Sequence, residues 1–339
     1  MSALRVAIVG AGIMGRTHAR VLADYHRSTL AAVCSRDEGR AAGLAREHGA
    51  PLVFTDYREL MASPEVDAVI IATPDFAHHD IAVAAAQAGK HILVEKPLTT
   101  DLAEADSIVA AVRAAGVVGS VLFNHRWIPA YYQAMQRIES GELGRPRMAY
   151  ARKNDTIYVP TEMIGWADRT TSAWFLNAHD IDLVTWYFGD EAVEAYASGV
   201  RGVLSGRGID TYDAIQAQVR YRGGAIATFE SCWIYPNSFP TMVDSWVAVT
   251  CERGVIHMDR KEEQIQVAGP QRFEFPRNLL LLDLTGRPQG SVRHAITHWV
   301  DCILDGAAPL VSLEHARHVT AILDAIHRSL REDRPVRVA

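Results

Sequence analysis

A glycine-rich hexapeptide near the amino terminus restricts the fold more than any other feature of the sequence. Gly10, Gly12 and Gly15, with Ile13 and Met14 between them, follow the apolar run 4–9 and open a helical pattern over about 14–25. This order of strand, glycines and helix is typical of dinucleotide-binding α/β domains. The glycines permit a tight turn, close approach of a pyrophosphate and close helix packing. We therefore expect these five residues to bind a dinucleotide, with its phosphates at the helix N-terminus.

Short apolar runs alternate with helical patterns through the first third of the chain. The runs that predict strands are 4–9, 29–34, a short one near Val53, 66–72, 91–94 and 117–123. The helical patterns are 14–25, 38–48, 57–62, a stretch opened by residues 75–79 and ending at 88, and 102–115. Strands that alternate with helices at this pace predict an α/β fold with a doubly wound parallel sheet, the Rossmann arrangement.

The residues after the second predicted strand bear on the choice of cofactor. NAD-binding proteins usually carry an acid there, which binds the ribose 2′-hydroxyl. This chain has Ser35 and Arg36 instead, and a guanidinium suits a 2′-phosphate. Asp37 and Glu38 follow, and an acid turned toward the ribose would suit NAD(H). The sequence favours NADP(H), with NAD(H) as the alternative.

Composition excludes several classes of function. The formal net charge of −6 gives no basic excess for nucleic acid or an anionic membrane. No apolar run approaches the ~18 residues of a membrane span, and a strand pattern that begins at Leu4 leaves no room for a signal peptide. The four cysteines lie far apart without a CxxC pair, which fits a reducing compartment. We expect a two-domain cytoplasmic protein that binds neither nucleic acid nor membrane.

Glu95-Lys96-Pro97 follows the predicted strand 91–94. A lysine at the carboxyl end of a strand lies where open α/β sheets place their ligands. Proline fixes φ and stiffens the turn that presents the lysine. By themselves these three residues would equally fit a surface Glu–Lys pair.

Two histidine-containing stretches were considered as metal sites. His78 and His79 are adjacent, so they point in different directions on a helix, and they lack a carboxylate or cysteine at ligand spacing. The stretch 314–318 carries one glutamate and two histidines with an arginine among them, which favours a solvated helix face. We predict no metal site, and we expect His78 to donate a hydrogen bond near the cofactor or the sheet edge.

The order and spacing of these motifs resemble the Gfo/Idh/MocA oxidoreductases, the glucose–fructose oxidoreductase and inositol dehydrogenase superfamily. The matching run extends to about Gly189 and consists of Gly10–Gly15 with His18, Ala72-Thr73-Pro74 with His78, Ala88-Gly89-Lys90, Glu95-Lys96-Pro97, Asn124-His125-Arg126, Gly141-Glu142-Leu143-Gly144 and His179-Asp180-Ile181-Asp182. The resemblance implies a nicotinamide cofactor and a sugar, polyol or related carbohydrate as substrate. It also implies a C-terminal α/β domain with a large, mainly antiparallel open sheet that forms the contacts of a dimer or tetramer.

The resemblance divides the chain and assigns its site residues. We predict a dinucleotide-binding Rossmann domain over residues 1–123 and a substrate-binding and oligomerisation domain over 124–339. Beyond the glycine-rich turn, the expected cofactor contacts are Ser35, Arg36, Thr73, Pro74, His78, Glu95, Lys96, Asn124 and Arg126. The expected catalytic residues are Lys96, His179 and Asp182. Substrate contacts are expected from these three and from Tyr158, Trp166 and Asn177.

The second half of the chain contains the predicted helix that carries His179. That helix covers 174–188 and places His179 and Asp182, three residues apart, on one face, where the carboxylate orients the imidazole or meets substrate. Residues 154–168 lack periodicity and predict a loop that lines a substrate pocket. The remaining patterns predict helices at 131–140, 292–305 and 313–331, strands at 148–153, 191–199, 211–221, 225–232, 244–251, 254–259 and 264–268, and a loop at 235–240.

One position departs from the family pattern. Sugar and inositol dehydrogenases of this family usually carry an aspartate four residues before the histidine, and this chain has Phe175 there, with Asn177 nearby. Either Asp182, Asn177 or another polar side chain substitutes, or the substrate differs from a simple ring polyol.

The predicted reaction is reversible hydride transfer between the nicotinamide and a carbinol carbon. His179 suits removal of the hydroxyl proton, and Lys96 as an ammonium stabilises the alkoxide charge, or is itself the base if burial lowers its pKa. Two alternatives stay open. A tightly held cofactor recycled within one turnover would give sugar–sugar oxidoreduction or redox-assisted glycoside cleavage, and loss of catalysis would leave a dinucleotide-binding sensor.

Overall fold

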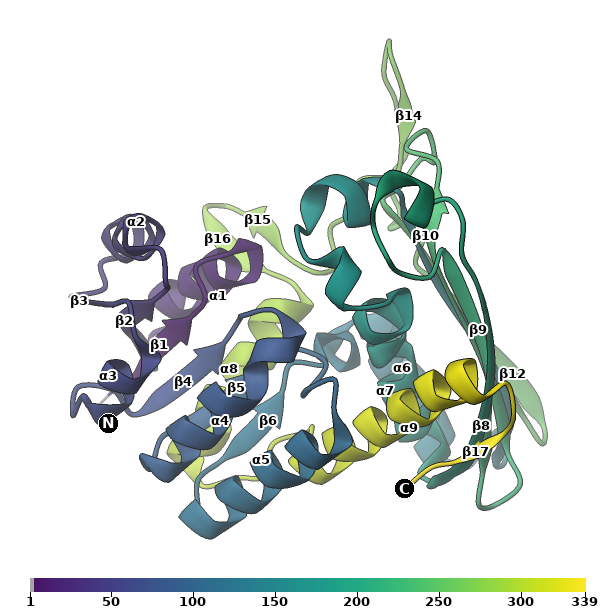
Figure 1. Cartoon of the computed structure of the whole chain (residues 1–339), viewed down its shortest axis with the longest axis horizontal. Coiled ribbons are helices and arrows are strands. Elements are labelled where there is room, and N and C mark those ends of the chain that lie inside the picture. The colour runs from purple at the N-terminus through teal and green to yellow at the C-terminus, as the bar shows by residue number, and fades with distance from the viewer. Residues whose placement is uncertain (1–2) are drawn as a thin grey trace. The chain divides into compact units, whose positions relative to one another are not determined.

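The computed structural model describes residues 3–339, which form two compact units (Figure 1). Unit 1 comprises residues 3–127 and Leu280–Arg317, and unit 2 comprises Ile128–Leu279 and His318–Ala339. The sequence division at 123/124 placed Leu280–Arg317 in the second domain. These residues join unit 1 because helix α8 (Ser291–Asp305) buries its apolar face in the same core as helix α1 (Ile13–Asp24).

Unit 1 is built on six parallel strands in the order β3-β2-β1-β4-β5-β6. Helices α1, α2 (Glu38–His48) and α8 lie on one face, and α3 (Tyr57–Ala62), α4 (His78–Gln87) and α5 (Leu102–Ala115) lie on the other (Figure 1). The strands are β1 (Leu4–Val9), β2 (Ser28–Cys34), β3 (Leu52–Phe54), β4 (Ala68–Ile71), β5 (His91–Val94) and β6 (Gly119–Val121). The predicted doubly wound sheet is confirmed. Its strand order reverses between β1 and β4, where such sheets bind ligands.

Local signals determine where several of these helices begin and end. The side chains of Asp37, Asp56 and Asp101 each accept a backbone N–H from the first turn of α2, α3 and α5. Gly49 and Gly116 have φ of 74° and 64° and end α2 and α5 in the left-handed conformation. These three helices have the predicted bounds because their caps are encoded within a few residues.

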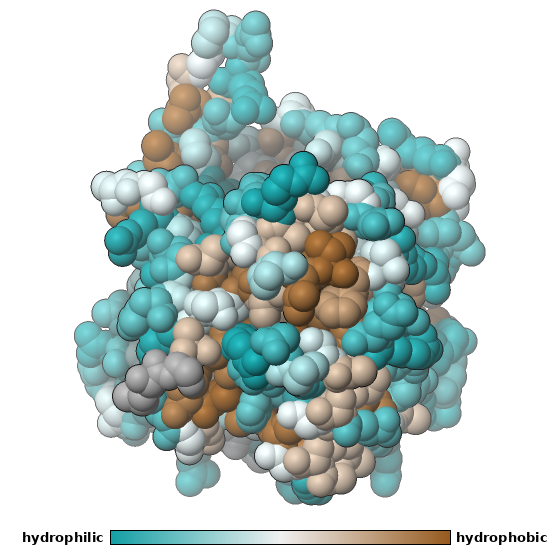
Figure 2. Space-filling view, turned by 90° about the vertical axis from the view of Figure 1, so that its left-hand side faces the viewer, coloured by the Kyte–Doolittle hydropathy of each residue, from teal (hydrophilic) through white to brown (hydrophobic). Residues whose placement is uncertain are grey.

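The surface of unit 1 is polar with apolar areas. Seen from the side on which β3 and α2 lie in Figure 1, hydrophilic side chains surround smaller apolar areas (Figure 2). The large apolar side chains that unit 1 exposes include Ile13 and Val53.

A short hairpin of β15 (Leu282–Leu284) and β16 (Arg287–Gln289) precedes α8.

Unit 2 contains a seven-stranded sheet in the order β12-β11-β7-β10-β9-β8-β17. Strands β7 and β10 are parallel and the other pairs are antiparallel, so the predicted mainly antiparallel sheet is confirmed. Helices α6 (Pro129–Glu139), α7 (Ala178–Phe188) and α9 (Leu313–Glu332, which begins in unit 1) lie on one side of it, and no helix among the described residues of unit 2 covers the other (Figure 1). The strands are β7 (Pro146–Thr156), β8 (Ala192–Val200), β9 (Ala214–Tyr221), β10 (Ile226–Tyr235), β11 (Val243–Cys251), β12 (Gly254–Asp259) and β17 (Val336–Arg337).

The predicted loop over residues 154–168 is wrong in its first part. Strand β7 continues to Thr156, because it pairs with β10 on one side and β11 on the other. The four residues 153–156 are all buried and all polar, so they show no hydrophobic alternation. A π-helical turn (Val159–Met163) and a 3₁₀ turn (Ala167–Arg169) follow.

Other boundaries also differ from prediction, and three of these differences lie in unit 2. Strand β10 extends to Tyr235, which was assigned to a loop. The helix predicted from residue 174 begins with a π-helical turn (Ala173–Asn177) before α7. The strand predicted at 264–268 is reduced to β13 (Val267–Ala268), which pairs with β14 (Phe273–Glu274) in a hairpin that projects from unit 2 (Figure 1).

Candidate active site

The glycine-rich turn leaves the N-terminus of α1 open to a ligand. Gly12 is the N-cap of the helix, no side chain caps it, and the first turn contains no acidic residue. The next side chain, Ile13, is 62% exposed. Unpaired N–H groups and the helix dipole at such an end attract phosphate groups.

The three glycines differ in what a side chain at each position would meet. A Cβ on Gly10 would overlap the carbonyl of Ala72, and one on Gly15 would overlap the carbonyl of Gly10. A Cβ on Gly12 would meet no atom within 4 Å. The Oγ1 atom of Thr73 is buried without a hydrogen-bond partner. An open position at Gly12 and an unsatisfied hydroxyl in the loop beside Gly10 fit a dinucleotide cofactor.

The residues after β2 are arranged around the start of α2. The Oδ1 atom of Asp37 accepts from the backbone N of Arg40 at 3.0 Å, and its Oδ2 lies 3.2 Å from Nε of Arg40. The Oγ atom of Ser35 accepts from the backbone N of Asp37 at 3.3 Å, and the Arg36 side chain is exposed. The carboxylate of Asp37 is therefore used by the helix, while Arg36 extends into solvent.

Glu95 and Lys96 follow the carboxyl end of β5. This strand lies in the same sheet as β1, which the glycine-rich turn follows. Glu95 is buried and Lys96 is partly exposed. The Nε2 atom of His18, on α1, lies 2.8 Å from Oε1 of Glu95. His18 is thus a site residue. Because it lies 77 residues from Glu95 in the sequence, no local sequence pattern predicts their contact.

Three predicted cofactor contacts in unit 1 are buried. Both ring nitrogens of His78 face backbone carbonyls. Asn124 donates to Oγ of Ser291 at 2.9 Å, and Arg126 donates to the carbonyl of Leu310 at 3.0 Å. These contacts attach the 3₁₀ turn Asn124–Trp127 to the segment around α8.

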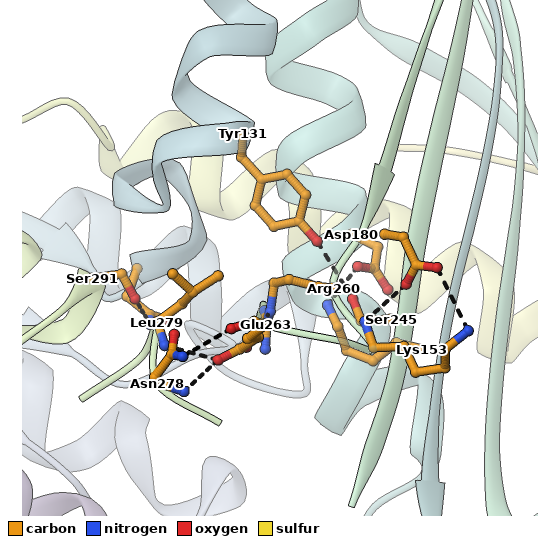
Figure 3. A network of polar contacts seen from close by, with 12 residues as sticks. Tyr131, Lys153, Asp180, Ser245, Arg260, Glu263, Asn278, Leu279 and Ser291 are labelled. Carbon is orange, nitrogen blue, oxygen red and sulfur yellow. Dashed lines mark hydrogen bonds and ion pairs between the residues drawn. The ribbon is translucent and has the colours of Figure 1, made fainter. Parts of the chain in front are cut away.

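In unit 2, α7 places a partly exposed histidine between buried polar residues. His179 is partly exposed, whereas Asp180 and Asp182 are fully buried. The Nζ atom of Lys153, on β7, lies 2.5 Å from Oδ1 of Asp180 (Figure 3). Asn177 donates to Oδ2 of Asp180 at 3.2 Å and to the carbonyl of Glu230 at 3.1 Å. Sequence reasoning missed Lys153, because a lysine in a strand pattern predicts an exposed side chain.

Phe175, at the position of the family aspartate, lies in an aromatic cluster of unit 2. Its ring is edge-on to Trp166 at 6.0 Å and to Trp233 at 5.7 Å between centroids. Trp233 is fully buried, Trp166 and Phe175 are partly exposed, and Tyr158 is 41% exposed. The amide nitrogen of Asn177 is directed inward, to Asp180 and to the carbonyl of Glu230. The position of the family aspartate therefore presents the aromatic ring of Phe175 and no carboxylate.

A second buried network of unit 2 lies at the base of the projecting hairpin. Arg260 donates to Oε1 of Glu263 at 3.2 Å, and Oε2 of Glu263 accepts the backbone N of Asn278 and of Leu279 (Figure 3). Burial lowers the pKa of Arg277, in the same segment, to about 10. These contacts attach both ends of the hairpin to unit 2.

Within residues 3–339, no three His, Cys, Asp or Glu side chains lie together in a way that could hold a metal ion. No helix in the same range combines the length and apolarity that a membrane crossing requires.

The sheet order, the glycine-rich turn and the open N-terminus of α1 define the class of dinucleotide-binding α/β proteins. The chain belongs to the Gfo/Idh/MocA oxidoreductase family. Residues 4–123 match the model of the oxidoreductase family, NAD-binding Rossmann fold, and residues 135–338 match that of its C-terminal alpha/beta domain. The predicted family and the predicted NAD(P)-dependent oxidoreductase class are confirmed.

Individual relatives agree with this assignment over nearly the whole chain. The chain is 27% identical over 341 residues to the scyllo-inositol 2-dehydrogenase (NAD(+)) of Bacillus subtilis, covering 99% of this chain and 96% of the relative. GenD2 from gentamicin A biosynthesis, in complex with NAD, superimposes with a TM-score of 0.86 at 25% identity, covering 100% and 97%. The scyllo-inositol dehydrogenase of Lactobacillus casei, with NAD(H) and scyllo-inositol, gives 0.85 at 19% identity, covering 99% of both, which shows a shared fold.

Proposed function

We propose that this protein transfers a hydride between NAD(P) and a hydroxyl or keto carbon of a sugar, polyol or related carbohydrate. The observation that carries the proposal is the Glu95-Lys96 turn, which holds a partly exposed lysine at the carboxyl end of β5 in a nucleotide-binding sheet. Relatives whose names state inositol dehydrogenase activity support the substrate class.

The proposed roles follow from the chemistry of each side chain. The bound nicotinamide supplies a hydride acceptor or donor. His179 takes the hydroxyl proton during oxidation, since an imidazole exchanges protons near neutral pH. Lys96, as an ammonium, stabilises the alkoxide charge that develops. Asp182, three residues from His179 and fully buried, orients the imidazole.

The proposed cofactor is NADP(H) in preference to NAD(H). Asp37 supports this choice, because its carboxylate caps α2 and pairs with Arg40. Arg36 is exposed at the end of β2, where a guanidinium suits a 2′-phosphate. The names of two relatives specify NAD, so both cofactors belong in the first assay.

The test is an absorbance screen at the reduced-nicotinamide band with NAD⁺ and NADP⁺. The candidate substrates are scyllo-inositol, myo-inositol, aldoses, methyl glycosides and, in the reverse direction, keto-sugars. Lys96→Ala and His179→Ala should each lower kcat about 10²- to 10⁴-fold and leave dinucleotide binding unchanged. Lys261→Ala and His257→Ala, outside the proposed site, serve as matched controls. A near-wild-type rate in either site variant rejects that residue's role.

The aromatic cluster around Phe175 favours a second candidate. A ring position without a carboxylate suits a substrate with an apolar face or substituent, such as a glycoside, rather than a free ring polyol. If the protein also holds its cofactor tightly, the reaction would be sugar–sugar oxidoreduction or redox-assisted glycoside cleavage. Dinucleotide that survives gel filtration, with turnover but no net reduction, would support this candidate. A protein that binds dinucleotide and turns over nothing in the screen would leave the sensor function.

We also propose a homo-oligomer formed through the open face of the unit 2 sheet. Met148, Tyr150, Trp246 and Ile226 lie on this face, and Met148 and Ile226 are 48% and 37% exposed. The test is the molar mass in solution by light scattering. Trp246→Glu should yield monomers, and a monomeric wild-type protein would reject the proposal.

The proposed compartment is the cytoplasm. All four cysteines are free and buried, which is the usual state of thiols in reducing conditions. Fractionation of cells that express the tagged chain is the direct test.

A further inference from the structure

The turn that carries Lys96 is held by two buried histidines from different helices. His18 lies on α1 and His78 is the first residue of α4, and neither side chain has any exposed surface. Their ring nitrogens contact Glu95, Pro97 and Leu98, on both sides of Lys96.

On one side, Glu95 connects His18 to the backbone of the lysine. Its Oε1 lies 2.8 Å from Nε2 of His18, and its Oε2 accepts the backbone N of Lys96 at 3.2 Å. Burial acts to raise the pKa of Glu95, but the hydrogen bond and charge of His18, with the charge of Lys96, outweigh it and hold the pKa below its usual value. The ionised carboxylate only accepts hydrogen bonds, so Nε2 of His18 is the donor.

On the other side, His78 joins the Lys96 turn to the loop after β4. Its Nδ1 lies 3.0 Å from the carbonyl oxygen of Pro97 and 3.3 Å from that of Leu98, and its Nε2 lies 3.0 Å from the carbonyl oxygen of Thr73. Through this one side chain, the turn that carries Lys96 is connected to the loop after β4.

We infer that His18 and His78 are positioning residues for Lys96, because their ring nitrogens contact the residues on both sides of it. The inference rests on the role proposed above for Lys96. It adds that the ammonium group is placed by two side chains that do not themselves meet the substrate.

The positioning role is tested by kinetics with the sugar or polyol that the screen selects. His18→Gln and His78→Gln should each lower kcat about 10- to 100-fold, because a displaced lysine affects the reaction step. In His18→Gln, whose side chain is not one of the expected cofactor contacts, the KM for dinucleotide should stay within about twofold. Unfolding curves verify that each variant is folded, since partial unfolding alone would lower the concentration of active enzyme.

His79→Gln is the matched control on the same helix. His79 contacts Asp80 at 2.8 Å and Ser107 at 3.1 Å, away from the Lys96 turn, so its kcat should stay at the wild-type value. Unchanged kcat in folded His78→Gln, or an equal loss in His79→Gln, overturns the positioning role. A wild-type rate in Lys96→Ala would instead reject the proposed function, so the two failures are distinguishable.

Discussion

The ammonium nitrogen of Lys153 lies 2.5 Å from Oδ1 of Asp180, and both side chains are almost completely buried. The second carboxylate oxygen of Asp180 accepts from Asn177, so each oxygen of this carboxylate has a partner within unit 2. The pair joins β7 to α7 at the residue next to His179. It therefore fixes the start of the helix that presents the proposed base.

Removal of one partner of this pair should destabilise unit 2 strongly. Lys153→Met leaves the Asp180 carboxylate buried and unpaired, which costs about 3–5 kcal/mol in comparable pairs. Urea unfolding measures the loss, and Lys153→Met/Asp180→Leu should recover most of it. Arg137→Met breaks the exposed pair with Glu142 and should change stability by less than about 1 kcal/mol. A Lys153→Met variant as stable as the Arg137 control would contradict this account.

Gly12→Ala should separate dinucleotide binding from folding. The added Cβ meets no protein atom within 4 Å, so the thermal midpoint should stay near that of the wild type. The methyl group occupies the space through which a pyrophosphate approaches the backbone, and Kd for NADP⁺ should rise about tenfold or more, about 1.4 kcal/mol. Isothermal calorimetry measures the change.

Gly43→Ala is the matched control for Gly12→Ala. Gly43 lies within α2 and also has no atom within 4 Å of an added Cβ. Alanine there should stabilise the helix by about 0.5–1 kcal/mol without any effect on Kd. Equal binding by the Gly12 and Gly43 variants would show that Gly12 does not face the cofactor.

Arg36 should determine the preference for NADP(H). Arg36→Ala removes the guanidinium expected at the 2′-phosphate, and KM for NADP⁺ should rise about tenfold while KM for NAD⁺ is unchanged. Ser35→Asp should favour NAD⁺, because it restores an acid for the ribose hydroxyl. Arg46→Ala, an exposed arginine in the last turn of α2, is the control. A wild-type enzyme that prefers NAD⁺ would reject the cofactor proposal before any variant is made.

His327 should make unit 2 sensitive to acid. Burial lowers the pKa of His327 from 6.5 to about 4, and the ring stacks on Trp174 with centroids 4.8 Å apart. In the unfolded chain this histidine binds a proton below pH 6.5, but in the folded protein only below about 4. Its contribution to stability is therefore complete above pH 6.5 and is lost as pH falls to about 4, a total of about 3 kcal/mol.

The measurement is the unfolding free energy as a function of pH in the wild type and in His327→Phe. Carboxylates contribute the same slope to both proteins, so the difference between the curves isolates His327. The difference in unfolding free energy between the two proteins should change by about 3 kcal/mol between pH 6.5 and about pH 4. His257→Phe, at an exposed position on β12, should keep the wild-type slope. Parallel curves for wild type and His327→Phe would disprove the assignment.

Much of unit 1 was predictable because its signals are local. The helices 38–48, 57–62 and 102–115 have the predicted bounds, since a capping aspartate precedes each of them. The glycine-rich turn and the strand before Glu95 were likewise identified from adjacent residues.

Unit 2 was less predictable where polar residues are buried. Residues 153–156 continue β7 although none is apolar, because partners from other segments, such as Asp180 for Lys153, satisfy them. Helix α8 was predicted, but its place in unit 1 was not, because its apolar face packs with α1 although almost 270 residues separate them. No pattern within a short window reports such contacts.

The sequence alone determined the family, the two kinds of sheet and the candidate residues Lys96 and His179, because glycines, caps and alternation act between near neighbours. Only the tertiary structure decided that His18 meets Glu95, that His78 faces carbonyls on both sides, and that Asn177 is directed inward to Asp180. A buried polar group needs a hydrogen-bond partner, and the fold can supply that partner from any part of the chain. Because His18 and Glu95 are 77 residues apart, no local sequence pattern indicates that they meet.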